Sequence, residues 1–173
     1  AGAGLNITSE NGVQKVVPNT AITNIIVEAV DGYFLPDGYE DRIQGLNGLT
    51  VTKMTKNGFA ISGTPISDVN ITLPPATKKV YSMILSGNGT FTGTCVGYQP
   101  INAKEFTITN SGNVDLENVD ISITGTDKDK FELIGDGTLT IQPNDTLKVA
   151  VAPKDSLATG IYRATLTVTA ANA

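Results

Sequence analysis

Residues 106–110 read Phe106-Thr107-Ile108-Thr109-Asn110, a run in which the side-chain type changes at every position. Successive side chains of a β-strand point to opposite faces, so Phe106, Ile108 and Asn110 would share one face and the two threonines the other. Threonine favours strands because its branched Cβ fits the pleated surface. The run therefore predicts a strand of an antiparallel sheet, with one face in a core and one in water.

The same alternation recurs through the second half of the chain. It is found at residues 119–123, 139–141, 147–151 and 162–168. Sequences typical of turns separate these runs, because Gly, Asn, Asp and Pro favour the backbone angles of a reversal. Short strands with turns at intervals of about 8–12 residues predict a β-sandwich. No stretch shows the spacing of apolar residues that an amphipathic helix requires.

The first half of the chain is also rich in predicted strands but is less regular. Residues 25–30 are apolar enough for a buried strand, and residues 49–54 and 59–61 form a predicted hairpin. Asn57-Gly58 supports the hairpin, because both residues tolerate the positive φ angles of a tight turn. Residues 69–73 alternate again and predict a further strand.

A pair of prolines marks the expected boundary between two modules. The last alternating run of the first half stops at Pro74-Pro75, and proline cannot donate a hydrogen bond to a β-ladder. Two prolines in succession favour a stiff connector, so we place the boundary within residues 74–79. The sequence predicts an all-β fold of two small domains in tandem, a β-rich module at residues 5–75 and a β-sandwich at residues 80–173.

Composition excludes several classes of function. The 173 residues contain no histidine, so neither a Ser-His-Asp nor a Cys-His nucleophile can be built, and the common zinc sites are excluded as well. The 17 acidic and 12 basic residues give a net charge of −5, which disfavours contact with nucleic-acid phosphates. No apolar run approaches the roughly 18–20 residues that span a bilayer. We expect no enzyme activity, no cofactor, no bound nucleic acid and no membrane insertion.

The single cysteine and the aspartates raise two specific alternatives, a reactive thiol and a calcium site. Cys95 lies in a strand-like run and is interpreted as a small buried hydrophobe, because no base lies near it in sequence to activate the thiol. The aspartates could suggest a calcium site, but their spacing does not match an EF-hand, and we predict no metal site. The aspartates in question are Asp115, Asp120, Asp127, Asp129 and Asp136.

Three aromatic residues of the first module form the one candidate ligand site. Tyr33, Phe34 and Tyr39 flank a turn-like sequence with several acidic neighbours. Aromatic rings exposed on a loop could stack against sugar rings, with the carboxylates as hydrogen-bonding neighbours. The simpler interpretation is that Tyr33 caps the small core and that Phe34 or Leu35 fills it.

The second module resembles bacterial immunoglobulin-like surface domains of the ASH-type or choice-of-anchor group. Such domains run from F-T-I-T-N-x-G, through G-x-D and F-x-L, to a G-x-Y-x-A-x-L-x-V strand. The corresponding segments here are residues 91–93, 97–98, 106–113, 125–127, 131–133 and 160–168. The resemblance implies an immunoglobulin-like β-sandwich, a fold that serves many unrelated functions.

The first module resembles repeats of Gram-positive cell-surface proteins, through the D-G-Y-x-L-P sequence at residues 31–36 and through residues 61–65 and 69–74. Together the two resemblances imply a non-catalytic structural or adhesion spacer of a secreted or cell-surface bacterial protein. Its partners would be other domains of the same parent chain and a protein or a glycan. The alternative function is a carbohydrate-binding accessory module that uses Tyr33, Phe34 and Tyr39.

Two further expectations follow from the immunoglobulin-like resemblance. Tyr162 would be a structural tyrosine corner, a residue whose hydroxyl bonds to an upstream backbone group. Immunoglobulin-like modules usually carry one more edge strand after the strand at 162–168. Either that last strand is missing from the sequence, or residues 80–85 supply the strand that closes the sandwich, which is the interpretation we favour. If neither holds, an unpaired edge would invite pairing with another chain.

Overall fold

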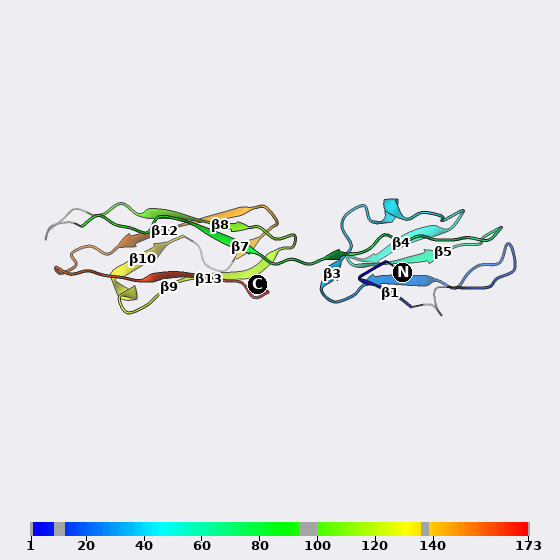
Figure 1. The fold of residues 1–173 in the computed structure, drawn as a ribbon, viewed down its shortest axis with the longest axis horizontal. Helices are drawn as coiled ribbons and strands as arrows, with labels where there is room; N and C mark the ends of the chain where they lie inside the picture. The colour runs from blue at the N-terminus through cyan, green and yellow to red at the C-terminus, as the bar shows by residue number, and fades with distance from the viewer. Residues whose placement is uncertain (1, 9–12, 94–99, 136–138, 173) are drawn as a thin grey trace. The chain divides into compact units, whose positions relative to one another are not determined.

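The computed structural model describes residues 2–8, 13–93, 100–135 and 139–172. The fold is all-β, with every strand pair antiparallel in this part of the chain, which confirms the predicted class. Two short 3-10 segments, η2 (Glu40–Arg42) and η3 (Lys128–Lys130), interrupt the strands. The chain divides into two compact units, Ala1–Lys79 and Val80–Ala173 (Figure 1).

The N-terminal unit is built on a four-stranded sheet in the order β1-β2-β5-β4. These strands are β1 (Leu5–Ile7), β2 (Ile25–Ala29), β4 (Thr50–Thr55) and β5 (Gly58–Ser62). The predicted strand at 25–30 and the predicted hairpin joined near Asn57 are both present. Residues 69–73 form no strand beyond a single bridge between Gln44 and Thr72.

A second, two-stranded sheet belongs to this unit and includes residues that the sequence analysis placed in the linker. It pairs β3 (Tyr33–Phe34) with β6 (Thr77–Lys78), and Lys79 also donates its backbone N–H to the Gly32 carbonyl. Residues 77–78, expected to lie in a linker, are therefore a strand of the N-terminal unit. The division into units falls immediately after them, at the end of the segment in which the sequence placed the boundary.

The C-terminal unit consists of two sheets that share one core. The four-stranded sheet has the order β10-β12-β8-β7 and the three-stranded sheet the order β11-β9-β13. Ile108 and Val149 enter the core from the first sheet, and Val119, Ile121 and Ile141 from the second. The strands are β7 (Met83–Gly87), β8 (Lys104–Asn110), β9 (Leu116–Thr124), β10 (Phe131–Ile134), β11 (Leu139–Ile141), β12 (Thr146–Pro153) and β13 (Thr165–Thr169).

The closing strand differs from the expectation. Residues 83–87 do form an edge strand, but this strand, β7, pairs with β8 in the four-stranded sheet. Within the described part of the chain, β13 is paired on one side only, with β9.

Candidate functional site

Tyr39 is a core residue of the N-terminal unit. Its side chain is 0% exposed, and its ring lies 5.7 Å from the ring of Phe59. The hydroxyl donates a hydrogen bond to the Pro74 carbonyl, and the Arg42 guanidinium lies over the ring at 5.4 Å. Burial raises the pKa of the Tyr39 phenol, because it disfavours the charged form, while the positive charge of Arg42 partly lowers that pKa.

The other two aromatic residues of the predicted sugar-binding group lie on β3. Tyr33 is half-buried and packs against the core around Phe59, and Phe34 is half-buried beside it. Leu35 is buried in the same core, as the simpler interpretation expects. Because Tyr39 has no accessible face, the exposed group of Tyr33, Phe34 and Tyr39 proposed for sugar stacking does not form, and Tyr39 is corrected to a structural residue.

Tyr162 holds the loop that leads into β13. Its hydroxyl donates a hydrogen bond of 2.9 Å to the carbonyl of Ala158, four residues upstream, as a tyrosine corner would. The residue itself precedes the strand, which begins at Thr165. The backbone N–H of Arg163 is held in turn by the Asp127 carboxylate at 2.8 Å.

The structure covers the cysteine and the aspartates only in part. Cys95 and Asp136 lie outside the residues that the structure describes. Among the described residues, no group of three acidic or cysteine side chains is placed to hold a metal ion. The side chain of Asp127 is instead used to fix the backbone of the loop before β13.

The C-terminal unit contains a pocket that sequence reasoning did not predict. It has a volume of about 930 Å³ and lies between the two sheets, at the end where β8 and β13 begin. Its apolar walls come from five strands and from the segment that follows β7. The residues that form these walls include Phe91, Phe106, Ile123, Phe131, Val151 and Leu166.

The lining of the pocket combines apolar side chains with polar groups. The rings of Phe91 and Phe131 lie 6.1 Å apart and tilted, a favourable aromatic contact. Residues 157–164 form part of the lining, and within them Ile161 is largely exposed. The arrangement can accept an apolar side chain and offers Arg163 and backbone groups to polar atoms next to it.

Strand alternation could not reveal this pocket. The pattern places Phe106 and Leu166 correctly on inner faces, but it does not say that the core is left open at one end of the sheets. That opening depends on how far each of five strands extends, which is a property of the assembled unit. A local signal is the apolar Ile161, which directly follows the turn-like sequence Ala158-Thr159-Gly160.

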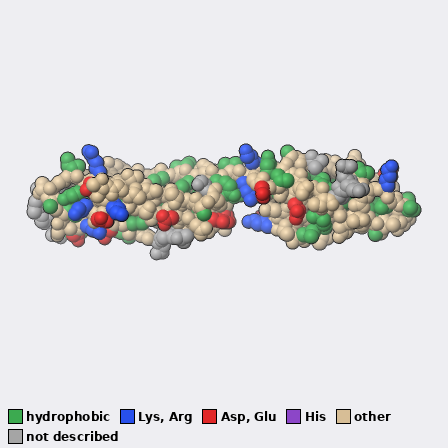
Figure 2. Space-filling model, turned by 90° about the horizontal axis from the view of Figure 1, so that it is seen from below, with side chains coloured by type: hydrophobic (Ala, Val, Ile, Leu, Met, Phe, Trp, Pro, Cys, Tyr) green, Lys and Arg blue, Asp and Glu red, His purple; other side chains and the backbone are tan. Residues whose placement is uncertain are grey.

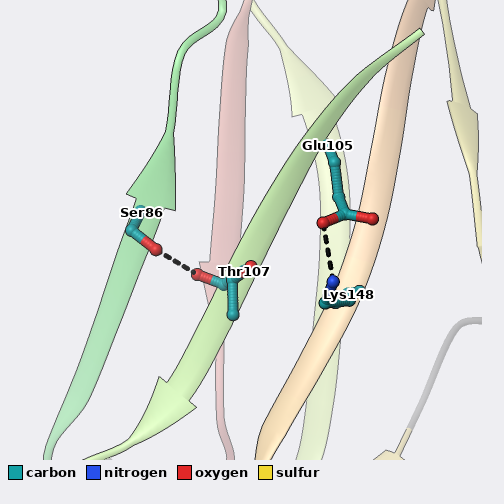
Figure 3. A network of polar contacts seen from close by, with 4 residues as sticks. All are labelled: Ser86, Glu105, Thr107 and Lys148. Atoms are coloured by element: carbon teal, nitrogen blue, oxygen red, sulfur yellow. Dashed lines mark hydrogen bonds and ion pairs between the residues drawn. The ribbon is translucent and has the colours of Figure 1, made fainter.

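Two polar contacts on the C-terminal unit link neighbouring strands. Lys148 on β12 bonds Glu105 on β8 at 2.8 Å, and the Ser86 hydroxyl donates to the Thr107 carbonyl across β7 and β8 (Figure 3). These groups are exposed, so each contact contributes little to stability. On the face seen in Figure 2, acidic and basic side chains are interspersed.

Comparison with known proteins leaves the chain without a relative to name. No family model, no curated protein and no solved structure matches it. In the part of the chain that the structure describes, no helix has the length and apolar character needed to cross a membrane.

Proposed function

We propose that the chain is a non-catalytic structural or adhesion spacer of a secreted or cell-surface bacterial protein. The observation that carries this proposal is the division into two compact β units, each with its own core. A unit with its own core keeps its length and surface without help from its neighbours, which is the property that a spacer requires. Its partners are then other domains of the same parent chain and a protein or glycan that the parent binds.

We also propose that the C-terminal unit is immunoglobulin-like. The order β7-β8-β12-β10 supports this assignment, because it matches the order of the first, second, fifth and fourth strands in such domains. The neighbours β9 and β13 correspond to the third and sixth strands. The place of the seventh strand, beside β13, has no counterpart among the described residues.

A replacement experiment in the parent protein tests the spacer role. The chain is exchanged for an unrelated pair of β domains of equal length, and surface display and adhesion are measured on intact cells. A spacer acts through its length, so both readouts are expected to survive the exchange. Adhesion lost while display is retained would contradict a spacer and indicate specific recognition by this chain.

The location is tested separately. Antibodies raised against the chain should label intact cells of the source organism or precipitate the protein from the culture medium. Labelling that requires permeabilised cells would contradict the proposed location.

A further inference from the structure

The part of the chain that the structure describes contains three Asn-Gly pairs, and each is held differently. They are Asn47-Gly48, Asn57-Gly58 and Asn88-Gly89. In such a pair the backbone nitrogen of glycine can attack the amide carbon of the asparagine side chain, because glycine has no side chain to block the approach. The attack is favoured when the pair is exposed, the nitrogen is free of hydrogen bonds and the amide carbon is held beside it.

Asn57-Gly58 is protected by the sheet of the N-terminal unit. Gly58 is buried as the first residue of β5, where it pairs with Glu28 of β2 and Thr55 of β4. The Asn57 carbonyl accepts the Ala29 N–H at 2.9 Å, and the buried side-chain oxygen of Asn57 has no hydrogen-bond partner among the described residues. Attack would require the end of this hairpin to open, so we expect this pair to react slowest.

Asn47-Gly48 is exposed, but its backbone conformation separates the reacting atoms. The two residues have φ of +40° and +89°, and the Leu49 N–H donates to the Leu46 carbonyl at 2.9 Å. These are the features of a type I′ turn, in which ψ of the first central residue is about +30°. At that ψ the Cβ of the asparagine lies anti to the glycine nitrogen about the Cα–C bond. The turn therefore has to open before this pair can react.

Asn88-Gly89 combines exposure with a geometry that favours the attack. Both residues are exposed and follow the end of β7, outside any strand. No described residue accepts a hydrogen bond from the Gly89 N–H. The Asn88 amide oxygen accepts the Thr90 N–H at 2.9 Å. This bond closes a small ring of atoms that contains both the amide carbon of Asn88 and the Gly89 nitrogen, so it holds the two reacting atoms close together.

The same hydrogen bond also acts on the barrier to the reaction. When the Gly89 nitrogen attacks, negative charge develops on the Asn88 amide oxygen. That oxygen already faces the Thr90 N–H, and a backbone donor placed where an oxyanion forms lowers the barrier to attack. The buried side-chain oxygen of Asn57 lacks such a donor among the described residues.

We propose that Asn88 is a site of spontaneous deamidation, with water as the only reactant consumed. A solvent base takes the proton of the Gly89 N–H, a bond forms between that nitrogen and the Asn88 amide carbon, and the amide nitrogen takes up a proton and leaves as ammonia. Water then adds to either carbonyl of the cyclic imide and breaks one of its carbon–nitrogen bonds. The product is an aspartyl or an isoaspartyl residue at position 88. This inference is independent of the proposed spacer role.

The modification changes the wall of the pocket in the C-terminal unit. Residues 89–93 line that pocket, and a Cβ at Gly89 would lie 3.2 Å from the Phe106 ring. An isoaspartyl linkage adds one methylene to the backbone immediately before these residues, and its carboxylate adds a negative charge beside them. Protein that has aged therefore differs from newly made protein at this pocket.

Ageing of the intact folded chain tests the proposal. The protein is incubated at mildly alkaline pH in heavy-oxygen water, and peptide mass spectrometry measures the conversion of each asparagine. Label from the water marks the residues that were converted during the incubation. Asn88 is expected to convert at least about tenfold faster than Asn57, and faster than Asn47, with isoaspartyl product present. Conversion of Asn88 no faster than that of Asn47, or aspartyl product alone, would overturn the proposal.

The unfolded chain supplies the reference for the effect of structure. In guanidinium chloride the three pairs lose their different surroundings, and each still has glycine as the next residue. The three conversion rates should therefore become similar, with the largest increase at Asn57. Rates that differ as much in the unfolded chain as in the folded chain would show that local sequence selects Asn88, and the structural proposal would fail.

Two proline variants test the hydrogen bond itself. Thr90→Pro removes the N–H that donates to Asn88 and leaves the Asn-Gly pair intact. It should slow conversion of Asn88 at least about tenfold. Thr92→Pro is the matched control, because Thr92 is also exposed and lies outside the strands, and it should leave the rate within about twofold. Thermal melts should show that both variants are folded. Equal rates in the two variants would overturn the role assigned to the Thr90 N–H.

Discussion

At the scale of single residues, Asn110 shows how a polar side chain can be required inside an apolar core. The residue is fully buried, and its amide nitrogen donates to the carbonyls of Val114 and Ile141, both at 2.8 Å. Its amide oxygen accepts the backbone N–H of Gly112 at 2.9 Å. Asn110 therefore ties the end of β8 to the turn that follows it and to β11.

Asn110→Ala is expected to lower the free energy of unfolding of the C-terminal unit by about 3 kcal/mol, because backbone groups buried around it lose their partners. Urea unfolding followed by circular dichroism measures the effect. Asn88→Ala is the control, since Asn88 is exposed and its side-chain oxygen accepts a hydrogen bond from the nearby Thr90 N–H. This control should change stability by less than about 0.5 kcal/mol. Similar losses for both variants would contradict the role assigned to Asn110.

Tyr39 makes the stability of the N-terminal unit depend on pH in the alkaline range. Burial raises the pKa of its phenol above the ordinary value of 10.0, an effect that Arg42 reduces in part. As the pH rises through 10, the unfolded chain loses this proton before the folded chain does. The unfolded state then binds fewer protons, so the free energy of unfolding falls as the pH rises. Below that pH the contribution of Tyr39 is complete.

Tyr39→Phe tests this dependence. The variant should be less stable than the native chain by about 1 kcal/mol at pH 8, because the buried Pro74 carbonyl loses its donor. The difference in free energy of unfolding between the two proteins should narrow toward pH 11, since only the native chain has a phenol at this position whose ionisation destabilises the folded state. Urea midpoints of both proteins across this range provide the measurement. A gap that stays constant with pH would show that Tyr39 does not control the alkaline response.

At the scale of elements, the bridge between Gln44 and Thr72 depends on a glycine. Gly45 has φ of +77°, and a Cβ at this position would lie 2.0 Å from the Asn70 carbonyl oxygen. Gly48 also has a positive φ, of +89°, but a Cβ there would meet nothing within 4 Å. The two glycines thus share a conformational requirement and differ in whether a neighbouring segment approaches the backbone.

Gly45→Ala should therefore destabilise the N-terminal unit by about 3 kcal/mol or more, because the backbone at Asn70 must move as well. Gly48→Ala should cost only about 1 kcal/mol, the strain of alanine at a positive φ. Thermal unfolding of the two variants gives the comparison. Equal losses of stability in the two variants would mean that the backbone at Asn70 can move away from residue 45 without a further loss of free energy.

The positions of many strands could be predicted from the local sequence, whereas their pairing could not. Alternation of the kind seen at Phe106–Asn110 marks residues that face a core, because the side-chain period of a strand is a local property. Pairing is not local, so the sequence could suggest a strand near residues 80–85 but not its partner: the strand that forms there, Met83–Gly87, pairs with β8. Thr77–Lys78 became a strand for the same reason, since its partner β3 lies more than forty positions earlier.

The candidate sites likewise differ in whether their contacts join residues that are near or distant in sequence. The burial of Tyr39 depends on contacts with Phe59 and Pro74, which are distant in sequence, so its aromatic character alone suggested exposure as readily as packing. The pocket near Phe106 and Leu166 arises from the ends of five strands. By contrast, the bond from Tyr162 to Ala158 spans four residues, a separation over which a sequence motif can be informative.

At the scale of the whole molecule, the two cores share no residue. One is built around Phe59 and Ile61, and the other around Ile108 and Val119. The division after Lys79 separates them in sequence as well. Because most of the stabilising free energy of a small β unit comes from the apolar area it buries, each unit has its own source of stability.

The two units should therefore respond separately to mutation. Ile61→Val and Ile108→Val each remove one methylene from a side chain that is almost completely buried, which costs about 1 kcal/mol. Hydrogen exchange in increasing urea, resolved by mass spectrometry, reads the stability of each unit within the intact chain. Ile61→Val should destabilise residues 1–79 alone and Ile108→Val residues 80–173 alone. A loss of stability in both units caused by either variant would show that the two units unfold as one cooperative body. One unit could then not stay folded, and keep its length, after the other had unfolded.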